Sequence, residues 1–174
     1  MTTGKPVISV KAVALNRNAY RSYGCVIAAD DELSWCPANM GTSRRFNHLA
    51  SVENLRHDKA KLNLCIFSCT PPKQLPLEVN LLEKHAYSTQ VFIPIDAQAR
   101  FLVIVCLGEG QPDLSTLAAF VAEGAEGISR FPGVWHYPMT ALDKTTDFSC
   151  LVYENGTRDD CTVHRFEAPI LIEV

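Results

Sequence analysis

Short apolar segments bounded by turn residues recur along most of the sequence. In 62–69 the larger apolar residues alternate with other positions, which is typical of a β-strand. Val91–Ile95 and Phe101–Leu107 are compact runs rich in β-branched and aromatic residues, and the polar segment Asp96–Arg100 separates them. The predicted strands are 7–14, 62–69, 91–95, 101–107, 148–153 and 161–166.

A hairpin is predicted in the last part of the sequence. Asn155-Gly156 is a residue pair that two-residue hairpin turns favour, because both positions tolerate a positive φ. The pair follows the predicted strand 148–153, and 161–166 can return as its partner. We therefore expect these two strands to lie side by side.

Helical patterns are rare. Ser115 can cap a helix over Thr116–Glu123, whose larger apolar residues would share one face, and Gly124 can end it. A second short helical turn is expected around Asn18–Ser22. Many strands with one or two short helices predict an all-β fold, either a barrel or a sandwich.

Composition and charge limit the class of protein further. The chain has 174 residues, of which 47% are hydrophobic and 20% charged, and this fits one globular domain over 1–174. The formal charge is −3, and Arg44-Arg45 is the only basic cluster, so we expect no nucleic-acid partner. The most continuous apolar run, Phe101–Leu107, is far too short to cross a bilayer, so we expect no membrane partner.

The cysteines suggest a cellular compartment. There are seven, an odd number, and several lie inside apolar runs. Buried thiols in a reducing environment explain this better than disulfides do. The segment Met1–Pro6 lacks the apolar core of a secretory signal. We therefore expect a cytoplasmic protein.

Residues that can bind a metal or transfer a proton occur in two segments. Glu83 and His85 are two positions apart, so on a strand their side chains project from the same face. Gln90 follows, and a turn or bulge before it would return its side chain to that face. His136 comes after a Pro-Gly turn, at the start of another strand. Carboxylate, amide and imidazole groups together offer nitrogen and oxygen donors suited to a borderline or hard divalent ion.

The spacing of these residues resembles the two cupin motifs, and further segments resemble one cupin family, the ureidoglycolate lyases. The segments that carry this resemblance are Asn39–Phe46, Leu82–Pro94, Arg130–Pro138 and Thr146–Phe148. They occur in the family's order and extend from about residue 23 to about residue 160. The resemblance implies a cupin-like double-stranded β-helix barrel of the jelly-roll type, with metal or substrate bound at its wide mouth.

The resemblance also implies an activity. Ureidoglycolate lyases are carbon–nitrogen lyases that cleave (S)-ureidoglycolate to glyoxylate and urea, late in the breakdown of allantoin in purine catabolism. The substrate carries a carboxylate, and the Arg45 guanidinium is the candidate to bind it through two parallel hydrogen bonds. Asn39 is a candidate neutral donor beside Arg45, and Gln90 is a further candidate for substrate binding.

Two mechanisms remain open for the same side chains. In the first, Glu83 removes the hydroxyl proton and His136 protonates the departing urea nitrogen. In the second, a divalent ion of unknown identity stabilises the developing alkoxide. The ligands of that ion would be Glu83, His85, Gln90 and His136.

Two other functions also remain open. One is a metal-dependent ureide amidohydrolase, which would release ammonium, and the other is a non-catalytic cupin that binds a small carboxylate. The resemblance implies a homodimer, and pairing of two chains would cover the edge strands that such a barrel exposes. No role is assigned to His48.

Overall fold

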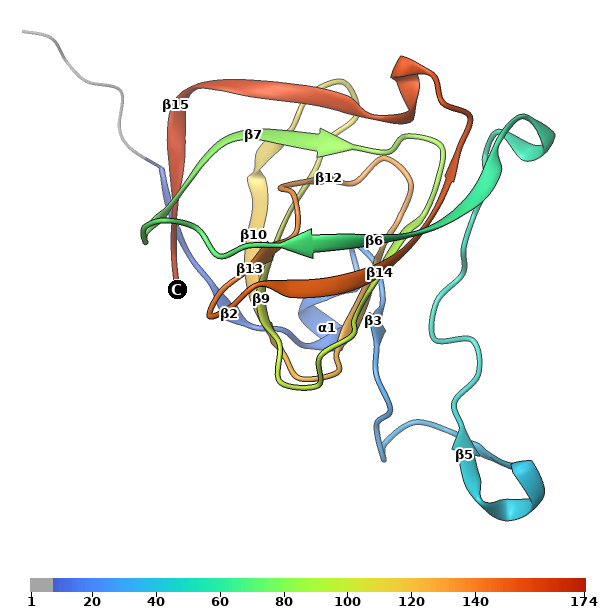
Figure 1. Cartoon of the computed structure of the whole chain (residues 1–174). Coiled ribbons are helices and arrows are strands. Elements are labelled where there is room, and N and C mark those ends of the chain that lie inside the picture. The colour runs from blue at the N-terminus through green and yellow to red at the C-terminus, as the bar shows by residue number, and fades with distance from the viewer. Residues whose placement is uncertain (1–7) are drawn as a thin grey trace, which may run out of the picture.

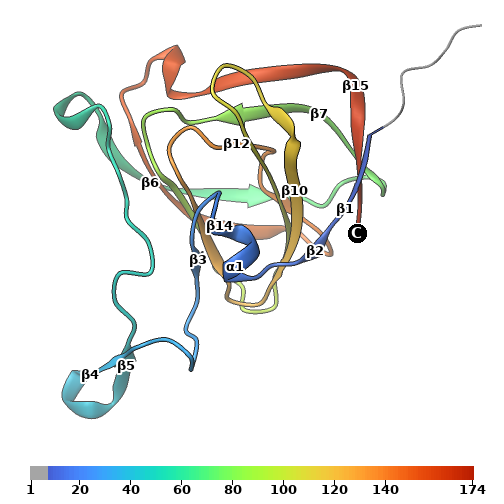
Figure 2. The ribbon, with the colours of Figure 1, turned by 180° about the vertical axis from the view of Figure 1, so that it is seen from behind.

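The computed structural model describes residues 8–174 and shows two β-sheets that wrap into a nearly closed barrel (Figure 1). The larger sheet has the strand order β1-β15-β7-β12-β9-β10-β2, with β13 paired to β9, and the smaller has the order β3-β11-β8-β14-β6. A separate pair, β4 and β5, stands clear of the barrel when it is seen from the front and from behind (Figures 1 and 2). This architecture confirms the all-β, cupin-like fold.

The element bounds are as follows. The strands are β1 (Ser9–Lys11), β2 (Val13–Ala14), β3 (Val26–Ile27), β4 (Cys36–Ala38), β5 (Ser43–Arg45), β6 (Lys61–Cys69), β7 (Leu77–Lys84), β8 (Gln90–Pro94), β9 (Arg100–Leu107), β10 (Asp113–Glu123), β11 (Gly127–Arg130), β12 (Trp135–His136), β13 (Thr140–Ala141), β14 (Thr146–Glu154) and β15 (Thr162–Glu173). The helical elements are α1 (Arg17–Tyr20) and the 3-10 turns η1 (Asn39–Gly41), η2 (His57–Lys59) and η3 (Arg158–Asp160).

Most of the predicted strands are confirmed. Those over 62–69, 91–95, 101–107, 148–153 and 161–166 correspond to β6, β8, β9, β14 and β15. The predicted strand over 7–14 is divided into β1 and β2, and Val7 lies outside the described residues. The two strands separate because β1 pairs with β15 whereas β2 pairs with β10.

The predicted hairpin is wrong. β14 pairs with β6 and β8 in the smaller sheet, whereas β15 pairs with β7 and β1 in the larger one. The Asp160 carboxylate accepts hydrogen bonds from the backbone N–H groups of Asn155 and Gly156, which curls the connection into a loop. The chain therefore crosses from one sheet to the other, because each strand buries more apolar surface there than in a two-stranded ribbon.

The predicted helix over 116–123 is also wrong, because this segment lies in strand β10. β10 pairs antiparallel with β9 over most of its length, with an irregularity between Asp113 and Ala118. At that irregularity the Thr116 hydroxyl accepts a hydrogen bond from the backbone N–H of Leu107. Pairing with the preceding strand β9 thus overrides a local helical pattern. The short helical turn expected near 18–22 is confirmed as α1, which Asn16 caps.

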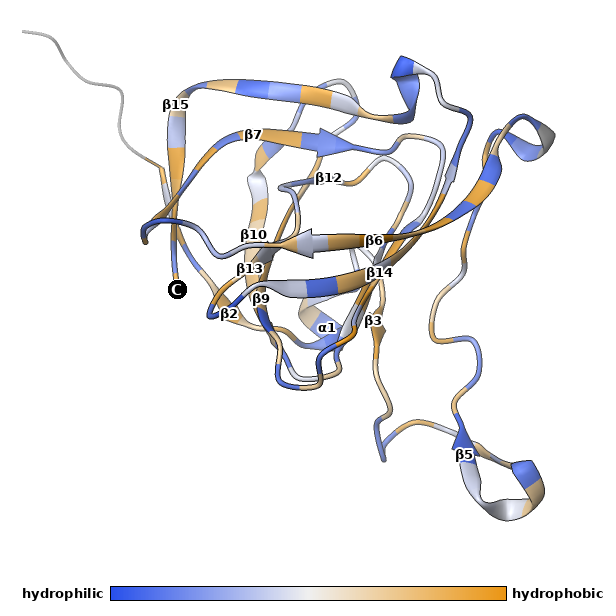
Figure 3. Cartoon of the chain, viewed as in Figure 1, coloured by the Kyte–Doolittle hydropathy of each residue, from blue (hydrophilic) through white to orange (hydrophobic). Residues whose placement is uncertain are grey.

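Strand β9 is buried on both faces, which explains its continuous apolar sequence. Phe101, Val103 and Val105 pack into one core cluster with Phe148. Leu102, Ile104 and Cys106 pack into a second cluster on the opposite face. The smaller sheet differs. Its edge strand β6 carries hydrophobic residues (Figure 3), and several of them are exposed. Among residues 8–174, no helix has the length and apolar character needed to cross a membrane.

Candidate active site

Glu83, His85, Gln90 and His136 come together although they lie on different strands. His136 on β12 pairs with Glu83 on β7, because β12 inserts between β7 and β9. A turn after His85 reverses the chain, so that Gln90 begins β8 with its Nε2 atom 3.1 Å from His85 Nε2. The fold therefore gathers a carboxylate, an amide and two imidazoles.

A pocket of about 470 Å³ opens beside this group. Glu83, His85 and Gln90 line one side, and the end of β6 with Thr70 lines another. The other lining residues are Phe92, Arg130, Pro138, Met139, Val152 and Glu154. The pocket is large enough for a small polar substrate.

Burial keeps both imidazoles neutral. It is the main cause that lowers the pKa of His136 to about 4, and the charge of Arg130 lowers it further. Burial also lowers the pKa of His85, although the charge of Glu83 opposes this.

Glu83 remains ionised for a different reason. Burial is the largest single effect and would raise the pKa of Glu83, but a hydrogen-bonding contact with His136 and electrostatic interactions with His136, His85 and Arg130 together outweigh it and lower the pKa. At neutral pH the cluster therefore consists of one carboxylate beside two uncharged rings.

Each neutral imidazole directs a lone pair toward the cluster. His85 Nδ1 lies 2.8 Å from the carbonyl oxygen of Asp160, and His136 Nδ1 lies 2.9 Å from that of Val134. A carbonyl only accepts, so Nδ1 of each neutral ring carries the proton and Nε2 carries the lone pair. His136 Nε2 is buried without a hydrogen-bond partner, 3.6 Å from Glu83 Oε1.

This arrangement fits a metal ion. Glu83, His85 and His136 each offer a ligand atom, and these atoms all lie within 4.8 Å of one another. Ring nitrogens that face a carboxylate, with the opposite N–H bonded to a backbone carbonyl, are typical of histidine ligands. Gln90, the fourth expected ligand, instead directs its oxygen to Arg130 and its amide group to His85.

Arg130 is a residue of this site that the sequence analysis did not single out. It is 2% exposed at the end of β11, its Nη1 donates to Gln90 Oε1 at 2.8 Å, and its guanidinium stacks over the Phe92 ring. Its Nη2 contacts the sulfur of Met139 at 3.0 Å, and its Nε has no hydrogen-bond partner. The feature of the sequence that could have identified Arg130 is its position at the start of the motif Arg130–Pro138.

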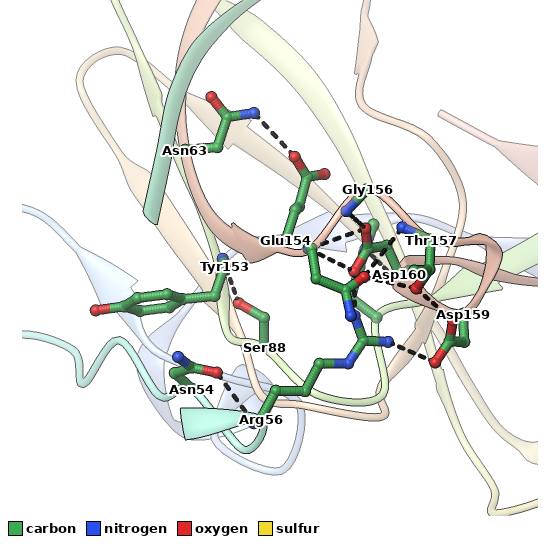
Figure 4. Close-up of polar contacts among 12 residues, drawn as sticks. Asn54, Arg56, Asn63, Ser88, Tyr153, Glu154, Gly156, Thr157, Asp159 and Asp160 are labelled. Atoms are coloured by element: carbon green, nitrogen blue, oxygen red, sulfur yellow. Dashed lines mark hydrogen bonds and ion pairs between the residues drawn. The ribbon is translucent and has the colours of Figure 1, made fainter. Parts of the chain in front are cut away.

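Arg56 holds a loop that borders the site, and Figure 4 shows its contacts with Asp159 and Asp160. Its side chain is only 9% exposed and forms an ion pair with the Asp160 carboxylate, which also accepts the N–H groups of Asn155 and Gly156. The backbone carbonyl of the same Asp160 accepts the hydrogen bond from His85 Nδ1. Arg56 thus fixes the loop that orients the His85 ring.

Asn39 and Arg45 do not reach this pocket within their own chain. Asn39 lies in η1 and Arg45 on β5, and both are exposed, as is His48 nearby. Asn39 Nδ2 donates to the Ser43 hydroxyl instead. The expectation that Arg45 shares one cavity with Glu83 is therefore wrong for a single chain, because the segment that carries Arg45 folds away from the barrel (Figure 1).

The fold and the site define a class of protein: a cupin-type barrel with a carboxylate and two imidazoles grouped so that they could hold a metal ion. The family model for ureidoglycolate lyase matches residues 7–173. Curated ureidoglycolate lyases from Escherichia coli O9:H4 and Shigella boydii serotype 18 are each 35% identical over 156 residues, which is 90% of this chain and 93% of each relative. The chain belongs to the ureidoglycolate lyase family.

Proposed function

We propose that this protein is a ureidoglycolate lyase that cleaves (S)-ureidoglycolate to glyoxylate and urea in allantoin and purine catabolism. The observation that carries the proposal is the family match over 7–173, in a chain whose pocket is lined by Glu83 and His85, with the buried His136 grouped beside them. A pocket of about 470 Å³ accommodates a substrate of this size.

The proposed metal ligands are Glu83, His85 and His136. Two imidazole nitrogens and one carboxylate suit a borderline divalent ion. An ion bound there would supply a Lewis acid that stabilises the negative charge developing on the substrate oxygen. Gln90 then serves as a hydrogen-bond donor from its amide group, since Arg130 holds its oxygen.

In the alternative without a bound ion, the His136 Nε2 lone pair is free, and the proton transfers can be assigned to the Glu83–His136 pair. The Glu83 carboxylate takes the proton from the carbinol hydroxyl, and the oxygen electrons form the glyoxylate carbonyl as the C–N bond breaks. The bond electrons leave with the urea nitrogen, which needs one proton. Glu83 and His136 Nε2 lie 3.6 Å apart, so the pair can hold the proton taken from the hydroxyl and return it to nitrogen. The reaction then requires no separate acid.

Product analysis tests the proposed activity. The protein is incubated with (S)-ureidoglycolate, and urea, glyoxylate and ammonium are measured against an enzyme-free control, because the substrate decomposes slowly by itself. We expect urea and glyoxylate in equal amounts. Ammonium would indicate a ureide amidohydrolase, and glyoxylate binding without turnover would indicate a non-catalytic cupin; either result contradicts the proposal.

Metal dependence is a separate prediction. Dialysis against a chelator should abolish turnover, and adding a divalent ion should restore it, because three lone-pair donors face one another. Metal content measured by mass spectrometry should fall and recover in parallel. Full activity in metal-free protein would instead support acid–base chemistry by Glu83 and His136 alone.

We further propose that the protein is a cytoplasmic homodimer. The seven cysteines are all free in the described chain, which fits a reducing compartment. β6 is an edge strand whose outward residues Leu62, Leu64 and Ile66 are 51%, 68% and 56% exposed. Packing of a second copy against β6 would cover this apolar surface.

A further inference from the structure

The segment 29–52, which we name the arm, lies outside the barrel. Its strands β4 and β5 pair only with each other among the described residues. Both views show the arm standing clear of the two sheets (Figures 1 and 2). An isolated two-stranded hairpin is marginally stable in water, so this geometry requires a surface to dock on.

Contacts at the base of the arm direct it away from its own barrel. The Arg17 guanidinium donates to the carbonyl oxygens of Val26 and Ala28 and pairs with Asp30. Asp31 in turn pairs with Arg44 on β5. The Arg17 contacts therefore fix the chain at the base of the arm, and the Asp31–Arg44 pair ties that base to β5.

The surface of the arm is suited to contact another protein. Trp35 is 49% exposed, and Met40 at the tip is completely exposed. Arg44 stacks on the rings of Trp35 and Phe46, whereas the Arg45 guanidinium has no hydrogen bond or ion pair within the described chain. The arm therefore presents exposed apolar side chains together with one free cation.

The pocket lacks a free guanidinium of its own, which is the group that the arm carries. Its lining includes the carboxylates Glu83 and Glu154, and its one guanidinium, Arg130, is buried and engaged by Gln90. The apolar edge strand β6 leads directly to the pocket, because its last residues line it. A second copy packed against β6 lies next to the pocket opening.

We propose that two copies exchange their arms, so that Arg45 of one chain enters the pocket of the other and binds the substrate carboxylate there. The occupant of each pocket opening is the arm of the second copy, with Asn39 beside Arg45. The two contacts are equivalent in a twofold dimer. The substrate assignment rests on the proposed lyase function, whereas the exchange itself does not.

Complementation between two inactive variants tests the exchange. Arg45→Ala has an intact pocket and a defective arm, whereas Glu83→Gln has a defective pocket and an intact arm. If arms are exchanged, each mixed dimer has one complete site, and an equimolar co-refolded mixture recovers about a quarter of wild-type kcat/KM. If each arm serves its own pocket, every site carries a defect and the mixture stays inactive, which would overturn the proposal. The control Arg165→Ala, at an exposed position on β15, should keep wild-type activity.

A cross-linking experiment decides the same question without any activity. A photoreactive phenylalanine analogue replaces Met40, and the cross-linked peptides are mapped in a mixture of isotope-labelled and unlabelled chains. We expect links between chains, from the arm to the segments that border the pocket, 67–70 and 138–139. Links confined to one chain would refute the exchange. Links between chains in a protein that releases no urea would refute the lyase function alone.

Discussion

Glu83 and His136 occupy one site but differ in charge at neutral pH. A neutral imidazole costs little to bury, so His136 loses its proton, whereas Glu83 gains enough from nearby positive and polar groups to stay ionised. The pair can therefore accept one proton. This is the state required to accept the hydroxyl proton of the proposed substrate.

Replacement of the carboxylate tests this role. Glu83→Gln should lower kcat at least about 10²-fold, because an amide neither accepts the proton nor ligates a metal well. Steady-state assays of glyoxylate release measure the effect. Glu78→Gln on the same strand is exposed and should act like wild type. Turnover close to normal in Glu83→Gln would place the base elsewhere.

The depressed pKa of His136 predicts a pH dependence of stability. Its pKa is about 4 in the folded protein and 6.5 in the unfolded chain, so the unfolded state binds more protons between these values. The contribution of His136 to the free energy of unfolding is therefore fully present above pH 6.5 and is lost as the pH falls toward 4. Between pH 7 and pH 5 this loss is about 2 kcal/mol.

Urea denaturation of metal-free protein at several pH values measures that loss. His136→Gln has no group that titrates in this range, so its free energy of unfolding should change less between pH 7 and pH 5. An equal loss in the variant and the wild type would show that His136 is not buried as a neutral ring.

At the scale of elements, the site depends on how separate segments support one another. His85 follows β7, but the carbonyl that orients its ring belongs to the loop before β15. Arg56 holds that loop through Asp160. A residue far from His85 in sequence thus determines where its lone pair points.

Arg56→Met should loosen this loop. We expect the affinity for Zn²⁺ to fall about tenfold or more, because the group that orients a ligand is no longer fixed. Isothermal titration of the metal-stripped protein measures it. Arg158→Ala, an exposed residue of the same loop, should bind Zn²⁺ like wild type. Unchanged Zn²⁺ affinity in Arg56→Met would show that Arg56 does not help to orient the metal ligands.

At the scale of the whole molecule, the edge strand β6 leaves apolar residues exposed on the barrel. The end of β6 lines the pocket and its exposed apolar residues precede that end, so association and catalysis would depend on the same strand. A dimer formed there would cover the edge and bring two arms near two pockets.

Leu64→Lys tests this dependence. Leu64 is 68% exposed, so the change should not disturb folding of the single chain, but it places a charge in the proposed interface. We expect light scattering to show half the wild-type mass, and kcat/KM to fall. Val13→Lys, at an exposed position on β2, should remain dimeric. A dimeric, fully active Leu64→Lys would locate the interface elsewhere.

The sequence by itself determined the fold class and most strands, because these depend on local alternation and on continuous apolar runs. It also indicated that Glu83 and His85 project to the same side, since a strand has a period of two residues, although β7 ends at Lys84 and His85 lies just beyond it. The sequence did not indicate which strands pair: 116–123, in β10, was assigned to a helix, and β14 and β15 were assigned to one hairpin, because local patterns carry no information on partner strands.

Only the tertiary structure decided how the site is assembled. It inserted β12 between β7 and β9, buried Arg130 against Gln90, and placed the Asp160 carbonyl behind His85. It also carried Arg45 away from its own pocket on the arm. The physical reason is that burial, and with it protonation and hydrogen-bond partners, results from packing between segments distant in sequence.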